Sequence, residues 1–93
     1  MRIRWSPHAV EQAKEIFEYI ARDRPEAAEG VLEGLIERVE LLREFPEQGR
    51  VVSGSEEGDI RSIVHGPHRI TYRVRAGEIA ILSVRHTRQE SEE

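Results

Sequence analysis

Six arginines and three histidines lie within residues 59–88, a segment that reads as three consecutive strands. Arginine forms paired hydrogen bonds with a phosphate or a carboxylate, and histidine gains and loses a proton near neutral pH. The segment therefore holds side chains suited to binding an anionic partner, and also to acid–base chemistry at a phosphate. The residues concerned are Arg61, Arg69, Arg73, Arg75, Arg85, Arg88, His65, His68 and His86.

The charge of the chain is distributed unevenly. Only Asp59 and Glu78 oppose the six arginines, so residues 59–88 carry a formal charge of +4, whereas residues 1–58 carry −5 and residues 89–93 carry −3. The net charge of −4 argues against indiscriminate nucleic-acid binding, which normally accompanies a basic domain. A strand backbone does not need arginine, so the clustering indicates a specific partner for this β module.

Several of these residues also have a structural interpretation. Arg61 either contacts a target or forms a cross-strand ion pair with Glu78. His86 is the best candidate for acid–base catalysis if the protein is a nuclease; in the structural interpretation it ends the last strand and bonds to a backbone carbonyl. Tyr72 is interpreted as a core residue or a buried hydrogen-bond donor. We predict no metal site and no cofactor, because the histidine spacing matches no zinc motif and the chain lacks cysteine.

Two amphipathic helices are predicted before the strands. A Ser-Pro pair at residues 6–7 supplies the N-cap and the first-position proline that favour a helix start. Apolar residues then recur at three- and four-residue steps over residues 7–24 and again over residues 25–45. The short link between them predicts an antiparallel helical hairpin. Gly30 and Gly34 are poor helix formers, and we expect them to allow close packing against the first helix.

The rest of the chain is predicted to form strands and one loop. Alternating charged and apolar residues predict a short strand at residues 2–5. Glycine and serine mark residues 46–58 as a loop, and strands follow at 60–65, 68–75 and 78–86. The predicted fold is therefore α+β, in the order β-α-α-β-β-β, with a small and mainly antiparallel sheet.

Ninety-three residues are enough for a single domain, here 1–93, in which residues 89–93 form a tail expected to fray. One helical hairpin covers only one face of a sheet. The arginines alternate along the strands, so we expect them on the face that the hairpin leaves open. We also expect a cytoplasmic protein that does not cross a membrane, because no stretch approaches the roughly 20 apolar residues that a span requires.

Four sequence motifs resemble those of the RelE/ParE superfamily of type II toxins, from bacterial toxin–antitoxin modules. IRWSPHAVEQAKEIFEYIARDRPEAA at residues 3–28 resembles the family's first strand, its Ser-Pro helix start and its helix junction. LLREFPEQGR at 41–50 resembles its loop entry. GPHRITYRV at 66–74, preceded by the Ile-Arg pair at 60–61, resembles its hairpin, and AILSVRHTR at 80–88 resembles its last strand.

The resemblance implies a bacterial toxin that slows growth and is neutralised by an acidic antitoxin. ParE-like members poison DNA gyrase and are not nucleases, whereas RelE-like members cut mRNA on the ribosome. The long helical hairpin, the loop entry and the low net charge favour the ParE-like branch. Under that interpretation no residue is catalytic, and the six arginines Arg61, Arg69, Arg73, Arg75, Arg85 and Arg88 contact the target or the antitoxin.

The alternative is a RelE-like endoribonuclease whose partners are the ribosome and mRNA. Arg61, Arg69, His86 and Arg88 would then be its catalytic residues, and no metal would be required. A toxin-like protein with a different or lost activity, and a small binding module without toxicity, are further alternatives. Poor tolerance of the protein by cells that lack its antitoxin would separate a toxin from a passive module.

Overall fold

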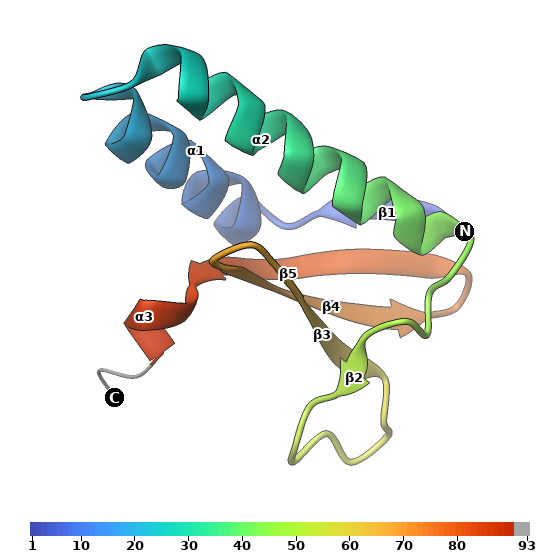
Figure 1. Cartoon of the computed structure of the whole chain (residues 1–93). Helices are drawn as coiled ribbons and strands as arrows, with labels where there is room; N and C mark the ends of the chain where they lie inside the picture. Colours follow the sequence, from blue (N-terminus) through green and yellow to red (C-terminus); the bar gives the residue numbers. More distant parts are fainter. Residues whose placement is uncertain (91–93) are drawn as a thin grey trace.

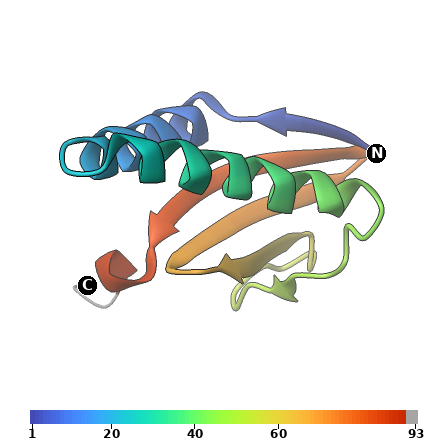
Figure 2. The same ribbon diagram turned by 45° about the horizontal axis from the view of Figure 1, so that its top comes forward.

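The computed structural model describes residues 1–90, which form two layers (Figure 1). One layer is a five-stranded sheet, and the other is a hairpin of two helices, α1 (Pro7–Ala21) and α2 (Pro25–Glu40). Figure 2 shows the hairpin lying over one face of the sheet. The predicted α+β fold, with a helical hairpin on one face of a mainly antiparallel sheet, is confirmed.

The strands follow the spatial order β1-β5-β4-β3-β2. β1 (Arg2–Trp5) runs parallel to β5 (Glu78–His86), while β4 (His68–Arg75), β3 (Ile60–His65) and β2 (Arg50–Val51) continue the sheet in antiparallel fashion. β5 is an interior strand, as its apolar run predicts. β2 lies inside the segment predicted to be a loop, because two residues are too few to show an alternating pattern.

The first helix begins as the sequence predicts. The Ser6 hydroxyl accepts a hydrogen bond from the Ala9 backbone N–H at 3.0 Å, and proline occupies the first turn. α1 ends at Ala21, slightly earlier than predicted, and a short turn leads into α2. No helix within residues 1–90 has the length and apolar character needed to cross a membrane.

The prediction that Gly30 and Gly34 allow α2 to pack closely against α1 is wrong. A Cβ atom on Gly34 would lie 3.2 Å from Nε2 of His65, so Gly34 lets α2 approach the end of β3. A Cβ atom on Gly30 would have no other atom within 4 Å. The glycines therefore do not bring the two helices together; only Gly34 serves a close approach, and it is an approach to the sheet.

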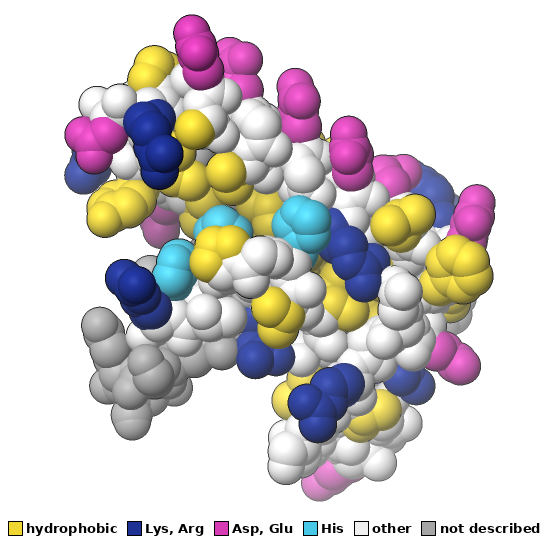
Figure 3. Space-filling view, in the orientation of Figure 1, with side chains coloured by type: hydrophobic (Ala, Val, Ile, Leu, Met, Phe, Trp, Pro, Cys, Tyr) yellow, Lys and Arg dark blue, Asp and Glu magenta, His cyan; other side chains and the backbone are white. Residues whose placement is uncertain are grey.

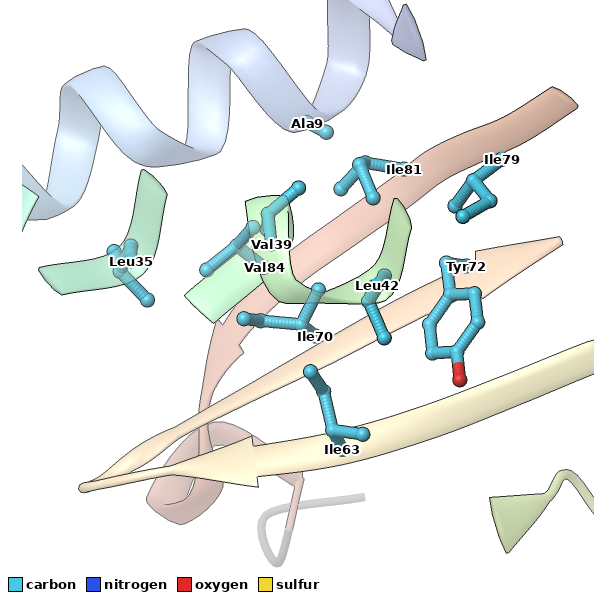
Figure 4. Close-up of a cluster of buried hydrophobic side chains, with 10 residues drawn as sticks. All are labelled: Ala9, Leu35, Val39, Leu42, Ile63, Ile70, Tyr72, Ile79, Ile81 and Val84. Carbon is cyan, nitrogen blue, oxygen red and sulfur yellow. The ribbon is translucent and has the colours of Figure 1, made fainter. Parts of the chain in front are cut away.

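The hydrophobic core fills the space between the two layers (Figure 4). Residues from α1 and α2 and from the short 3-10 helix η1 (Leu41–Arg43) meet residues from β3, β4 and β5, and the partly buried Trp5 packs against this cluster. Burial of these apolar side chains is the main stabilising term for a chain of this size. The central members are Ala9, Leu35, Val39, Leu42, Ile63, Ile70, Tyr72, Ile79, Ile81 and Val84.

The described part of the chain ends in a short helix, α3 (Thr87–Glu90). The tail predicted to fray begins at residue 89, so it overlaps the last two positions of this helix. Residues 91–93 lie outside the described residues, and the fraying stays a prediction.

Candidate functional site

Four of the predicted arginines lie on the face of the sheet that the helices leave open. Arg69 lies directly opposite Arg85 in the ladder between β4 and β5, and Arg73 and Arg75 follow on the same face of β4. The residues between them alternate toward the helices, where Ile70 is fully buried. The predicted position of these four arginines is therefore confirmed by the register.

Two of the open-face arginines bind acidic residues of the preceding loop. Arg75 donates to Asp59 at 2.7 Å and to Glu57 at 3.0 Å, and Nε of Arg73 lies 3.5 Å from Asp59. Burial opposes ionisation of Asp59, but the hydrogen bond and charge of Arg75, together with the charge of Arg73, hold the pKa of Asp59 below its usual value. Arg73 and Arg75 thus hold the segment from Glu57 to Asp59 against the sheet. Arg69 donates to the Ser62 hydroxyl at 3.2 Å.

Arg61 lies on the opposite face of the sheet from this group, which corrects the prediction that it belongs to the open face. It pairs with the buried Tyr72 in the β3–β4 ladder and therefore faces the helices. Its Nη1 donates to the backbone carbonyls of Glu47 at 3.1 Å and Gly49 at 2.8 Å. The alternative pairing with Glu78 is also wrong, because that carboxylate pairs with arginines of β1.

Tyr72 binds the segment 46–49 that Arg61 also contacts. Its hydroxyl is a buried hydrogen-bond donor, as predicted. The hydroxyl donates to the Pro46 carbonyl at 2.9 Å and accepts from the Gly49 backbone N–H at 2.8 Å. Burial raises the pKa of Tyr72, and the Gly49 hydrogen bond and the charges of Arg61 and Arg38 oppose the rise without cancelling it. We call residues 46–49, with Arg61 and Tyr72, the loop clamp.

The three histidines of the β module form a row across the sheet on the face that the helices cover. His65 lies opposite His68, and His68 lies opposite His86. The His68 and His86 rings meet edge to face with centroids 5.6 Å apart. His86 ends β5 as predicted, and its Nδ1 accepts a hydrogen bond from the Arg88 backbone N–H at 3.1 Å. The topology thus gathers titratable groups that are up to 21 residues apart in the chain.

His68 is the member of this row that is least accessible, with 4% of its surface exposed. Burial lowers the pKa of His68, and the electrostatic effects of the neighbouring His86 and His65 lower it further. The folded protein therefore resists protonation of His68 more than the unfolded chain does, and this favours the neutral imidazole at neutral pH.

The lowered pKa of His68 predicts a loss of stability in mild acid. The unfolded chain takes up a proton near the usual pKa of 6.5, before the folded protein does, so the stabilisation is complete above that pH and declines as the pH falls toward the folded-state pKa. We expect a lower melting temperature at pH 5.5 than at pH 7.5. His68→Phe should flatten this dependence, whereas His8→Gln, which removes an exposed histidine, should preserve it. An unchanged slope in His68→Phe would contradict the assignment.

A groove of about 1190 Å³ runs between the helical hairpin and the end of the sheet that carries the histidine row. Figure 3 shows histidine side chains gathered at this junction, with basic side chains beside them. Ile16, Ile20 and Val31 supply apolar wall, while Arg85 and Arg88 lie at the rim. A groove with apolar walls and a cationic or titratable floor suits an amphipathic segment that carries acidic side chains.

Among the side chains that the structure describes, those of residues 1–88, no three histidine, cysteine or acidic groups are placed to hold a metal ion. The sequence interpretation overlooked Arg38 of α2, which acts electrostatically on the loop clamp. A signal was available: Arg38 is the single basic residue of that helix and lies between the buried Leu35 and Val39. The exposed side of the same helix carries only acidic charges, from Glu26, Glu29, Glu33, Glu37 and Glu40.

Comparison with known proteins agrees with this architecture. The chain resembles Y4kP of Sinorhizobium fredii (strain NBRC 101917 / NGR234), which its name describes as a suspected toxin, with 34% identity over 91 residues that span 96% of this chain and 91% of the relative. The fold matches a solved structure described as the chromosomal ParDE toxin–antitoxin system from P. aeruginosa, with a TM-score of 0.82 and 23% identity. That match covers 92% of this chain and 95% of the other.

The family match covers almost the whole chain. The model of the ParE toxin of the type II toxin–antitoxin system parDE matches residues 3–91, which include both helices, the loop clamp and the histidine row. With a match of this extent, the chain belongs to the ParE toxin family of type II toxin–antitoxin systems.

Proposed function

We propose that this ParE-family toxin inhibits DNA gyrase in the cytoplasm, and that a cognate antitoxin neutralises it. The family membership supports a target of this kind, and the acidic net charge of −4 disfavours a mechanism that depends on extensive contact with RNA phosphates. The proposal makes the protein a binding inhibitor without catalytic residues of its own.

One observation carries the choice against RNA cleavage: the four residues of the nuclease alternative do not converge. Arg61 is held by backbone carbonyls on the helix-facing side, four positions along β3 from His65. At about 3.3 Å per residue this places it roughly 13 Å from the histidine row. Arg69 lies on the other face of the sheet. A phosphodiester held near His86 would not be in reach of both arginines.

A supercoiling assay tests the proposal. Purified protein, freed of any antitoxin, is titrated into DNA gyrase with relaxed plasmid and ATP. We expect supercoiling to be lost and linear, gyrase-linked DNA to accumulate, while heat-denatured protein leaves gyrase unaffected. Unimpaired gyrase together with cleavage of ribosome-bound mRNA would overturn the proposal in favour of a RelE-like nuclease.

Neutralisation is tested separately by expression in cells. Induction of the protein alone should slow growth, and co-expression of the antitoxin should restore it. Free expression of the protein alone, at full growth rate, would contradict a toxin and would fit a passive binding module.

A further inference from the structure

Three further arginines share the open face of the sheet with the four described above. Arg2 and Arg4 of β1 pair with β5 residues that lie opposite Arg75 and Arg73 of β4. Arg50 of β2 pairs with an open-face position of β3. Directly paired residues point to the same side of a sheet, so arginines occupy this face from β1 at one edge to β2 at the other.

A row of hydroxyl side chains crosses the same face between the arginines. Ser62 of β3 lies opposite Thr71 of β4, and Thr71 lies opposite Ser83 of β5. Arg69 and Arg73 flank Thr71 two residues away on either side, a distance of roughly 7 Å along a strand. Guanidinium groups and hydroxyls are both common hydrogen-bond donors to phosphate oxygens. The face thus offers rows of donors at a regular spacing.

The arginines of this face outnumber the carboxylates that contact them among the described residues. Glu78 pairs with the two arginines of β1, and Glu57 and Asp59 pair with Arg75. Asp59 also lies 3.5 Å from the buried Nε of Arg73, which has no hydrogen-bond partner in the described part of the chain. Seven arginines and these three carboxylates give the face a formal charge of +4.

The acidic charges of the chain belong largely to the other layer. Residues 7–45, which hold both helices, contain ten acidic and five basic residues, a formal charge of −5. Figure 3 shows acidic side chains along this helical layer. Packed layers lie about 10 Å apart, and the Debye length at physiological salt is about 8 Å. The acidic layer is therefore largely screened from a ligand on the open face, and the net charge of −4 does not describe this surface.

We propose that the open face of the sheet binds the phosphate backbone of duplex DNA. The arginines extend about 20 Å along β4, from Arg69 to Arg75, and about 19 Å across the strands from β1 to β2. Duplex DNA carries one negative charge per roughly 1.7 Å of its axis, so a surface of this size meets several phosphates at once. A single carboxylate would occupy only a small part of it. In the complex with gyrase, which rests on the proposed function, the DNA is the duplex that the enzyme itself holds.

The composition of the face favours a duplex over a single strand. Proteins hold single-stranded nucleic acids largely by stacking bases on aromatic side chains. Within the described strands no tryptophan, tyrosine or phenylalanine lies on this face, because Trp5 and Tyr72 face the helices and pack in or against the core. The contacts are therefore confined to the backbone of the nucleic acid, and we expect binding without sequence preference.

The loop carboxylates occupy part of the surface that DNA contacts in this proposal. The side chains of Glu57 and Arg75 are 71% and 57% exposed, and an ion pair so exposed is weak. Phosphates therefore displace Glu57, while Asp59 keeps the loop attached. Glu57→Gln should strengthen DNA binding about twofold or more. Glu37→Gln, an equal change of charge on the exposed side of α2, should change it by less.

Fluorescence anisotropy tests the proposal without gyrase or antitoxin. A fluorescein-labelled 20-bp duplex of mixed sequence is titrated with the protein at 50 mM and at 200 mM NaCl. Contact with three to four phosphates predicts an affinity that falls about 40- to 150-fold between these two salt concentrations. A duplex of unrelated sequence should bind with the same affinity to within about twofold.

Substitutions at the two edges of the sheet locate the site. Arg2 and Arg50 are exposed, so the double variant Arg2→Gln, Arg50→Gln should remain folded. It should bind the duplex about tenfold more weakly at 50 mM NaCl and with a smaller salt dependence. The control is Lys14→Gln, Arg22→Gln, which removes two exposed positive charges from the helical layer and should change the affinity less than about twofold.

Three results would overturn the proposal: absence of binding at 50 mM NaCl, equal weakening by the two double variants, or tighter binding of another polyanion than of the duplex. The polyanions compared are single-stranded RNA of 20 nucleotides, phosphatidylserine vesicles and hexaglutamate, which represent RNA, a membrane and an acidic protein segment. Gyrase is absent throughout, so failure of the gyrase proposal would leave this result unchanged. Absence of DNA binding would in turn leave intact an inhibition of gyrase through protein contacts alone.

Discussion

Gly49→Ala is expected to destabilise the protein by about 2–4 kcal/mol. A Cβ atom on Gly49 would lie 2.6 Å from the Tyr72 hydroxyl and 2.8 Å from the Ser62 carbonyl oxygen. Such overpacking typically costs about 1–3 kcal/mol. Moving the loop away would break hydrogen bonds within the loop clamp, each contributing about 0.5–1.5 kcal/mol. Backbone atoms lie on one side of the added methyl group, so a change of rotamer cannot relieve the contact.

Urea denaturation measures this effect as a lower transition midpoint at an unchanged m-value. Gly30→Ala is the matched control, because a Cβ atom there meets no neighbour and alanine is the better helix former by up to about 1 kcal/mol. The two substitutions should therefore act in opposite directions. A Gly49→Ala variant as stable as the wild type would show that residues 46–49 can move at little energetic cost. The loop clamp would then not hold them in one position.

Leu35→Ala is expected to destabilise the protein by about 2–5 kcal/mol, the range for removing a large aliphatic side chain from a packed core. Leu35 is fully buried between α2 and the sheet (Figure 4). The adjacent Ile36 is 44% exposed, and Ile36→Ala should change the free energy of unfolding by much less. Similar losses for the two variants would mean that the helical hairpin does not pack on the sheet as described. Thermal or urea unfolding of the purified proteins gives both values.

Elements with long, regular patterns could be predicted from the sequence alone. The Ser6-Pro7 helix start is a local capping signal, whereas the two apolar helix stripes and the alternation of Arg69, Arg73 and Arg75 in β4 each follow one periodicity. All of these features appear in the structure. The faces of β3 were harder to predict, because apolar residues occupy both of them. Ile63 is buried, whereas Val64 is 52% exposed, so alternation alone could not place Arg61.

Other features depend on contacts between segments that are distant in the chain. Glycine at position 34 leaves room for the His65 side chain of β3. Local helix propensity contains no information about this contact between two elements. The β4–β5 ladder also shifts register between Thr71 and Tyr72, which changes the alternation of β5 relative to its neighbour. The histidine row arises only when β3, β4 and β5 are assembled. A count of arginines could indicate an anionic partner but not the position of its site.

The parallel pairing of β1 with β5 has a consequence for the synthesis of the toxin. Arg2 lies beside Glu78, so the first strand made has no partner in the sheet until the last strand has been translated. At about 5–20 residues per second, β1 waits on the order of 4–15 s while the intervening chain is made. The histidine row includes His86, which is translated later still. The groove beside the histidine row is therefore incomplete until β5 has been translated.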